Sequence, residues 1–298
     1  MDAYAGQMLY VDLGTEKTRI EPTPHALKRH YMGGRGFGIR LLSDMVDPKA
    51  DPFHDDNVIV FATGPLTGTG VPMGSRYEVT TVSPLTGTAI SANSGGVFGW
   101  KMKRAGFDAV VVGGRARRPV YLFIADGRAE LRAAGALWGK TTSATVESII
   151  EEHGDPSIRV ACIGPAGERR VRFACIINEK TRAAGRGGAG AVMGAKNLKA
   201  IATRGSMTIE VADEDRLKEV NDRVREKVGE NGIAKALHTY GTAVLVNIIN
   251  ENYILPTRNF QTAYFPTATE SIRRGDRKVN SEEAKGVLQL HHPVCASP

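Results

Sequence analysis

Short apolar segments that end in glycine, aspartate or asparagine recur along the chain up to residue 207. Rich in Val, Ile, Tyr and Phe, they read MLYVDL, NVIVFATG, RYEVTTVS, TAISAN, DAVVVGG, VYLFIADG, RVACIG and VRFACIIN. Such segments are typical of β-strands. Helical signals interrupt them at residues 141–153, which have Thr/Ser caps and an apolar face, and more weakly at residues 25–31. Because a doubly wound sheet would have a helix after nearly every strand, the pattern predicts an α+β fold with mixed or antiparallel sheets.

The pattern changes after Val211. Asp213 supplies a helix cap, and apolar residues then recur at helical spacing at Leu217, Val220, Val224 and Val228. We therefore assign residues 1–207 to a first domain and residues 208–298 to the beginning of a mainly helical domain. One clear helix and a proline-broken stretch make a poor independent core, so this second domain is expected to be incomplete.

Charge leaves two interpretations open. The chain has 39 Lys/Arg and 32 Asp/Glu residues, with a formal net charge of +7. This balance suits either an anionic partner or an ordinary solvated surface. Aromatic residues make up 6% of the sequence, too few for the stacking that nucleic-acid binding needs, so nucleotide or nucleic-acid binding is the least favoured hypothesis.

Neither a membrane nor an export signal is indicated. The sequence has no run of eighteen apolar residues, and the N-terminus lacks the pattern of a signal peptide, so we expect a cytoplasmic protein without a membrane partner. Cys162 and Cys175 lie in apolar runs, which predicts buried, reduced thiols in strands.

A glycine-rich, basic stretch at residues 178–200 reads NEKTRAAGRGGAGAVMGAKNLKA. Its glycines spell GxGxxG, but they lie too far from the preceding strand and lack the later acidic residue of a dinucleotide-binding unit. No GK[ST] follows, which excludes a P-loop. A bare backbone, a helix beginning near Gly190 and the forked donors of Arg182 and Arg186 would still suit an anion. A purely structural connection between strand and helix is the alternative.

A second stretch with similar chemistry covers residues 73–108. If its two strands form a hairpin through SPLTG, Arg76 and Asn93 lie at the same end of that hairpin, close to a glycine pair. GGRGFG, at residues 33–38, is a third loop of this type. Three such loops predict a broad platform for a polyanionic ligand.

Several motifs together resemble the N-terminal part of the tungsten-containing aldehyde ferredoxin oxidoreductases. They are ATGPLTGTGVPMGSRYEV, SPLTG…ANSGGVFG, KRAGFDAVVVGGRA, IGPAGE, TRAAGRGGAGAVMGAKNLKAIA and YGTAVLVNIINEN…RNFQT, and they extend to about Phe265. The resemblance implies a base of two β-sheets beneath a bis-pterin cofactor that carries tungsten or molybdenum. It also implies Mg²⁺ between the two pterin phosphates.

The resemblance assigns roles to individual residues. Arg76 matches an arginine that lies between a pterin and an iron–sulfur cluster. Asn93 and Ala183 match positions whose backbone carbonyls hold magnesium, which prefers oxygen ligands. The remaining matches are pterin and phosphate contacts: Gly95, Arg182, Gly185 and Arg186.

The family chemistry is oxidation of an aldehyde to a carboxylic acid, with electrons leaving through a [4Fe–4S] cluster to ferredoxin. Four thiolates hold such a cluster, in a pattern C-x-x-C-P-x-x-C with a later cysteine. Cys295 is the candidate for the first ligand, but Pro298 stands at the second position, so an incidental thiol is the alternative. No residue is assigned as catalytic acid or base, because those of the family lie further along the chain.

The leading hypothesis is thus the cofactor-binding part of an oxidoreductase that does not turn over alone. A non-catalytic cofactor-binding or scaffold subunit of a redox complex is the alternative. The choice between tungsten and molybdenum, the particular aldehyde and the formation of homo-oligomers stay open.

Overall fold

The computed structural model describes residues 3–240 and 244–266. The chain divides into two compact units, Met1–Asp215 and Arg216–Pro298. Our boundary after residue 207 stays a prediction. We describe each unit by itself.

The first unit contains two six-stranded mixed sheets, which confirms the α+β prediction. Sheet 1 has the order β2-β1-β6-β3-β4-β5 and consists of β1 (Gln7–Asp12), β2 (Lys17–Pro22), β3 (Ile59–Thr63), β4 (Tyr77–Val82), β5 (Ala89–Ser94) and β6 (Ala109–Gly113). Sheet 2 has the order β11-β10-β9-β12-β7-β8 and consists of β7 (Val120–Ala125), β8 (Arg128–Ala133), β9 (Arg159–Cys162), β10 (Ile176–Asn178), β11 (Arg182–Ala184) and β12 (Leu198–Arg204). One parallel pair lies in each sheet, β1 with β6 and β7 with β12. Each sheet is built from one continuous half of the unit.

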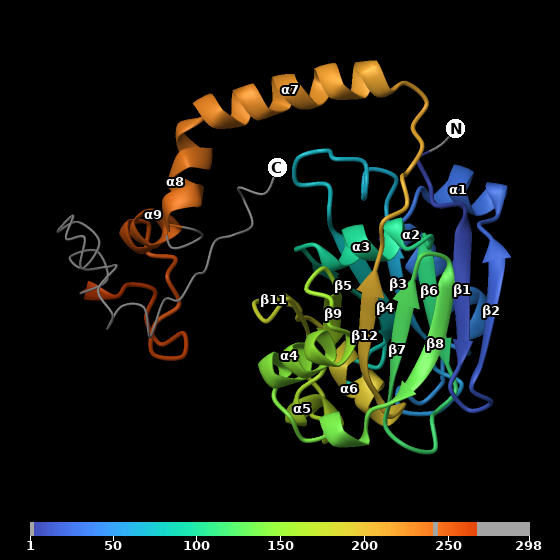
Figure 1. The fold of residues 1–298 in the computed structure, drawn as a ribbon. Coiled ribbons are helices and arrows are strands. Elements are labelled where there is room, and N and C mark those ends of the chain that lie inside the picture. Colours follow the sequence, from blue (N-terminus) through green and yellow to red (C-terminus); the bar gives the residue numbers. More distant parts are fainter. Residues whose placement is uncertain (1–2, 241–243, 267–298) are drawn as a thin grey trace. The chain divides into compact units, whose positions relative to one another are not determined.

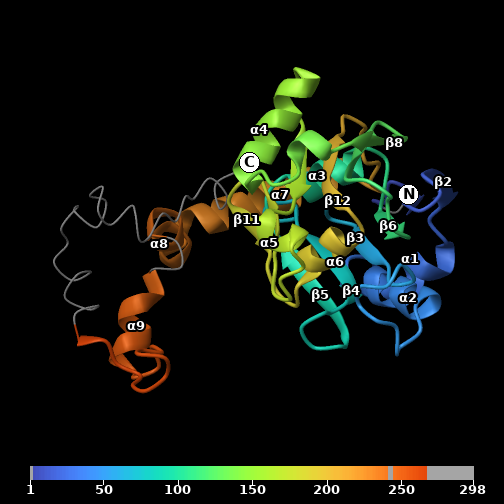
Figure 2. The ribbon, with the colours of Figure 1, turned by 90° about the horizontal axis from the view of Figure 1, so that it is seen from below.

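Apolar residues on both faces of the sheets form three cores. The main core joins residues of both sheets, among them Phe61 and Tyr77 from sheet 1 and Leu122 and Ile201 from sheet 2. A second core packs α1 (His25–Tyr31) and α2 (Arg35–Met45) on the outer face of sheet 1, and a third packs α4 (Thr142–His153) on the outer face of sheet 2. Figure 2 shows α1 and α2 on one side of the sheets and α4 on the other.

The shorter helices close the space between the sheets. Both α3 (Phe98–Arg104) and α6 (Ala189–Ala195) contact strands of sheet 1 and sheet 2. Between α4 and α6 lies the short α5 (Pro165–Glu168), and the 3-10 turn η1 (Gly135–Leu137) precedes α4. The helices predicted at residues 25–31 and 141–153 are confirmed, and the hydroxyl of Thr141 accepts from the Ala144 N–H as the cap of α4.

The predicted strand VRFACIIN is wrong over most of its length. Only Ile176–Asn178 pair in a ladder, because the backbone before them turns toward the glycine-rich stretch, where Gly190 N donates to Ala174 O at 3.0 Å. Cys162 is buried in β9 as predicted, and burial raises the pKa of its thiol to about 12. Cys175 precedes β10 and is half-buried, so its placement as a buried strand thiol is wrong.

The expected third anion-binding loop, GGRGFG, instead begins the helix α2. A Cβ at Gly38 would lie 2.1 Å from Thr80 Oγ1, so glycine at this position lets the helix approach β4. The polar edge strands β2 and β8 were not predicted either. Their sequences, KTRIEP and RAELRA, lack a buried apolar run, and such charges are typical of protected sheet edges.

The second unit contains α8 (Gly232–Tyr240), α9 (Val246–Glu251) and most of α7 (Glu214–Glu230), which begins at the unit boundary. The predicted helix after Asp213 is confirmed, and its apolar residues are half-buried. Cys295 lies outside the described residues. Among the helices that the structure describes, none is long and apolar enough to cross a bilayer.

Candidate functional site

The candidate site lies where the two sheets meet edge to edge. β5, the last strand of sheet 1, contacts β11, the last strand of sheet 2, while each keeps its own ladder on one side only (Figure 1). We call these two strands, with the residues that flank them, the seam. Seven residues that the sequence singled out lie on the seam or at the adjoining end of β4: Arg76, Asn93, Gly95, Arg182, Ala183, Gly185 and Arg186. Edge strands offer backbone groups to a ligand.

Arg76 and Asn93 meet as the predicted hairpin requires. The register pairs Glu78 with Asn93, and Arg76 Nη1 donates to Asn93 Oδ1. Asn93 Nδ2 donates to Glu78 Oε1 at 2.9 Å, and Ser91 Oγ donates to the other carboxylate oxygen at 2.6 Å. The amide of Asn93 therefore holds the exposed Arg76 guanidinium at the seam. Sequence reasoning missed Glu78, whose position opposite Asn93 follows from the hairpin register.

Arg182 shows the most direct sign of a missing partner. Its Nε and Nη2 atoms are buried, and they have no hydrogen-bond partner among the described residues. Leaving buried guanidinium donors unpaired is costly, because charge is removed from water without compensation. An anionic group at the seam would satisfy them, so Arg182 fits a phosphate or another oxyanion.

The glycines of the seam divide into two kinds. A Cβ at Gly95 would meet nothing within 4 Å, so this strand end leaves open space. Gly188 instead has a φ of 78°, and a Cβ there would lie 1.8 Å from Arg172 O. The structural interpretation of the glycine-rich stretch thus holds for Gly188, whereas Gly95 is free to border a ligand.

The helix predicted near Gly190 is confirmed as α6, but its expected role at an anion is not supported. Gly190 N donates to Ala174 O at 3.0 Å, and Ala191 N donates to Gly188 O at 2.9 Å. These amides are therefore engaged within the protein. Among the groups that the sequence proposed for an anion, the arginines therefore stay candidates.

A buried amide joins the two sheets beneath the seam. Tyr77 Oη and Ser94 Oγ both donate to Asn178 Oδ1, at 3.0 and 2.7 Å, and Asn178 Nδ2 donates to Gly95 O at 2.9 Å. Asn178 is fully buried. Burial also raises the pKa of the Tyr77 hydroxyl, which stays protonated and acts as a donor.

Glu179 connects the end of β10 to the start of α3. Its Oε1 accepts from the N–H groups of Val97 and Phe98, both at 2.6 Å, at the start of α3. The sequence analysis missed Glu179 and Asn178. A polar pair directly after the apolar run FACII is the signal that could have identified them.

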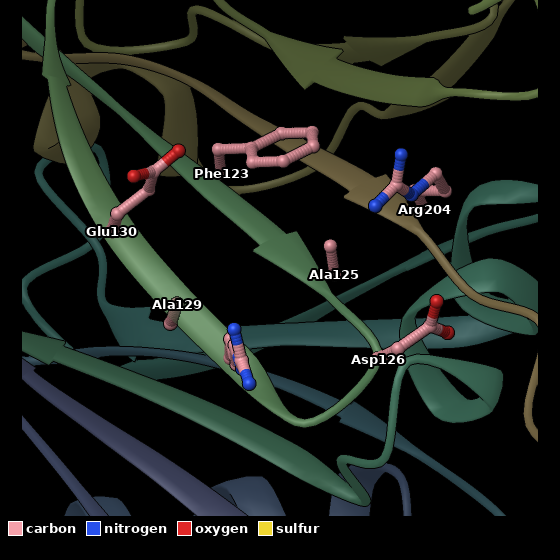
Figure 3. A pocket seen from close by; sticks show the side chains of 7 residues that line it. Phe123, Ala125, Asp126, Ala129, Glu130 and Arg204 are labelled. Atoms are coloured by element: carbon pink, nitrogen blue, oxygen red, sulfur yellow. The ribbon is translucent and has the colours of Figure 1, made fainter.

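Two pockets of the first unit lie away from the seam. One of about 550 Å³ is lined by residues of β7, β8, the turn between them and the end of β12, including Phe123, Asp126, Arg128 and Arg204 (Figure 3). Another of about 690 Å³ lies along β1 and β2. In residues 3–240 and 244–266, no group of three or more His, Cys, Asp or Glu side chains could hold a metal ion. A metal at the seam would therefore depend on backbone carbonyls or on a bound organic ligand.

These features define an α+β domain of two mixed sheets, with a candidate site that is bordered by arginines where two sheet edges meet. A family model described as "Aldehyde ferredoxin oxidoreductase, N-terminal domain" matches residues 8–205, and one described as "domains 2 & 3" of the same enzymes matches residues 219–297. The chain belongs to the aldehyde ferredoxin oxidoreductase family.

Two curated relatives illustrate the similarity of this chain to known proteins. The "Tungsten-containing aldehyde ferredoxin oxidoreductase" of Pyrococcus abyssi is 51% identical over 271 residues, which are 91% of this chain and 45% of the relative. The "Aliphatic sulfonate oxidoreductase, WOR-like subunit" of Pyrococcus furiosus is 34% identical over 290 residues, which cover 91% of this chain and 46% of that one. The chain thus spans less than half the length of these relatives.

A solved structure shares the fold. It is titled "Active site complex BamBC of Benzoyl Coenzyme A reductase in complex with 1,5 Dienoyl-CoA", and it superposes with a TM-score of 0.74 at 36% identity. The match covers 76% of this chain and 35% of the other. The fold of this chain is therefore also found in a complex of benzoyl coenzyme A reductase.

Proposed function

We propose that this chain is the cofactor-binding part of an aldehyde:ferredoxin oxidoreductase and holds a bis-pterin that carries tungsten or molybdenum at the seam. The observation that supports this most is the pair of buried nitrogens of Arg182, Nε and Nη2, which have no hydrogen-bond partner among the described residues. Arg182 lies on one sheet edge, and Asn93 on the other edge holds the guanidinium of Arg76. Two pterin phosphates would supply the oxyanions that such donors require.

Each seam residue has a stated part in this proposal. Arg182 and Arg186 bind phosphate or pterin oxygens, and Gly95 and Gly185 leave room for the ligand to approach the backbone. Arg76 donates to the pterin and, in a complete enzyme, toward an iron–sulfur cluster. The carbonyls of Asn93 and Ala183 are the proposed magnesium ligands.

The bound group would supply the two-electron redox step of aldehyde oxidation. The overall conversion takes an aldehyde and one water to a carboxylic acid, two protons and two electrons. In a complete enzyme, a [4Fe–4S] cluster would supply one-electron transfer to ferredoxin. The contribution of this chain is to bind and orient the cofactor, since we assign no acid or base among the described residues. Cys295 stays the candidate for one cluster ligand. Cytoplasmic location and homo-oligomer formation also stay predictions.

Metal and pterin content tests this proposal without relying on turnover. The 298-residue chain is purified without oxygen from a host supplied with tungstate and molybdate. Tungsten, molybdenum, magnesium and iron per chain are then measured by elemental analysis, and released pterin by fluorescence after oxidation. We expect tungsten or molybdenum with pterin in the wild-type chain, and about tenfold less in Arg182→Ala, since charge-assisted hydrogen bonds are lost.

Arg117→Ala is the matched control, because Arg117 is an exposed arginine outside the seam. Equal pterin content in both variants, with unchanged thermal unfolding, would contradict the assignment of Arg182. A chain that holds metal and pterin in a redox complex but never supports aldehyde-dependent ferredoxin reduction would favour the scaffold alternative.

A further inference from the structure

Three arginines of the first unit point to a surface with a different role. They lie in the segment RRVRF, residues 169–173, between α5 and β10, which we call the arginine loop. Arg169, Arg170 and Arg172 are exposed, and their side chains have no hydrogen bond, ion pair or ring contact with any residue that the structure describes. Three neighbouring guanidinium groups therefore face solvent without a partner.

The nearest acidic residues in the sequence do not neutralise the loop. The carboxylate of Glu168 accepts from Gly139 N and pairs with Lys199 Nζ at 2.5 Å, with a side chain only 5% exposed. Glu179, on the other side, is bonded to the start of α3. Both carboxylates are engaged with other parts of the protein, so neither of them neutralises the arginine loop.

Exposed apolar side chains accompany this charge. Phe173 is 68% exposed at the end of the arginine loop, and Leu85 is 52% exposed in the turn between β4 and β5. A Cβ at Gly188 would lie 1.8 Å from Arg172 O and 3.1 Å from Pro84 Cγ. The backbone just before Phe173 and the turn that carries Leu85 therefore both approach Gly188, which brings the two segments close together.

The arginine loop is held in a defined conformation. Val171 N donates to Ala166 O at 2.9 Å, and Ala174 N donates to Val171 O at 2.8 Å. Gly190 N then fixes Ala174 from the glycine-rich stretch. Because the backbone is already ordered, a partner would lose little conformational entropy of this loop on binding.

We propose that the arginine loop, with Phe173 and Leu85, is a docking surface for a partner protein that presents acidic side chains around an apolar contact. Arginine and aromatic residues are enriched in the centres of protein interfaces, and opposite charges steer the encounter. A polynucleotide is less suited, because the loop offers a single aromatic ring for stacking. None of these residues has a part in the proposed cofactor site, so the inference does not depend on that proposal.

Binding of an acidic polymer to the intact 298-residue chain tests the surface. The probe is a fluorescently labelled, glutamate-rich copolymer of glutamate and tyrosine, and its anisotropy is followed at about 0.01 M salt, where screening is weak. We expect the charge reversal R169E/R170E/R172E to weaken binding at least about tenfold, as the sum of several modest ion pairs. Phe173→Ser should weaken binding of this copolymer and leave binding of poly-glutamate unchanged.

The control R29E/R117E/R118E changes the net charge by the same amount at exposed arginines elsewhere in the first unit. Equal loss of binding in both triple variants would overturn the proposal, since it would show attraction by net charge alone. Tighter binding of oligo(dT), abolished by R169E/R170E/R172E, would identify a polynucleotide surface instead and also overturn it. If the triple variant shows altered thermal unfolding, Arg172→Gln is compared with Arg117→Gln, and an equal effect of these two refutes the docking surface.

Discussion

Replacing Asn178 with alanine tests whether this buried amide holds the two sheets together. The change removes three hydrogen bonds and leaves the hydroxyls of Tyr77 and Ser94 and the carbonyl of Gly95 without partners. An unsatisfied buried polar group costs about 1–3 kcal/mol, so we expect a loss of about 4 kcal/mol in the free energy of unfolding. Such a loss is a large fraction of the stability of a domain.

Tyr77→Phe provides the matched comparison. It removes one donor, while Asn178 Oδ1 still accepts from Ser94, so the expected loss is about 1 kcal/mol. In the Asn178→Ala background, the same change removes a hydroxyl that already lacks its acceptor and should be neutral or stabilising. A double-mutant cycle therefore isolates the coupling between the two side chains.

Urea unfolding followed by the fluorescence of Trp100 and Trp138 measures these differences, since both tryptophans lie in the first unit. The proposed role of Asn178 is refuted if Asn178→Ala lowers the free energy of unfolding by less than about 1 kcal/mol, the contribution of one ordinary hydrogen bond. It is also refuted if Tyr77→Phe is equally costly in both backgrounds.

Three further predictions concern other parts of the fold. Burial lowers the pKa of Lys103 to about 8, so the unfolded chain binds more protons above that pH, and Lys103 should add about 2 kcal/mol to the free energy of unfolding from pH 8 to pH 10. Burial lowers the pKa of Lys196 to about 8 as well, so urea unfolding of Lys103→Met should show a rise that is about 2 kcal/mol smaller than that of the wild type but not absent. Gly38→Ala should lower the midpoint of thermal unfolding, because the added Cβ would lie 2.1 Å from a threonine hydroxyl on β4, whereas Gly229→Ala, with nothing within 4 Å, should increase helicity in circular dichroism. Iodoacetamide at pH 8 should modify Cys175 in the folded chain and spare the buried Cys162, whose pKa is about 12; mass spectrometry of peptides would contradict this if both reacted equally.

The sequence predicted the interior of the fold better than its edges. Strands such as β3 and β6 are buried along most of their length, so their apolar runs identify them. The edge strand β8 alternates charged residues with alanine or leucine, and its pairing with β7 follows from tertiary context. Helix α2 was missed because its glycines disfavour a helix locally, although Gly38 is needed where the helix crosses β4.

The candidate site was predictable only where its contacts are determined by local sequence. The Arg76–Asn93 contact follows from the hairpin register, which local sequence determines. The burial of Nε and Nη2 of Arg182 does not, because Arg182 lies on an edge strand that meets β5, a strand far away in the sequence. Asn178 and Glu179 were missed because their partners are also distant along the chain.

The two sheets are formed by separate halves of the first unit, so assembly of the seam requires both halves. Residues 7–113 supply every strand of sheet 1 and residues 120–204 every strand of sheet 2, so each half can complete its own ladders during folding. The seam requires both halves, because β5 comes from one half and β11 from the other. A chain with one half misfolded would present a single arginine-bearing edge, and capture of a ligand that spans both edges would select the correctly assembled molecules.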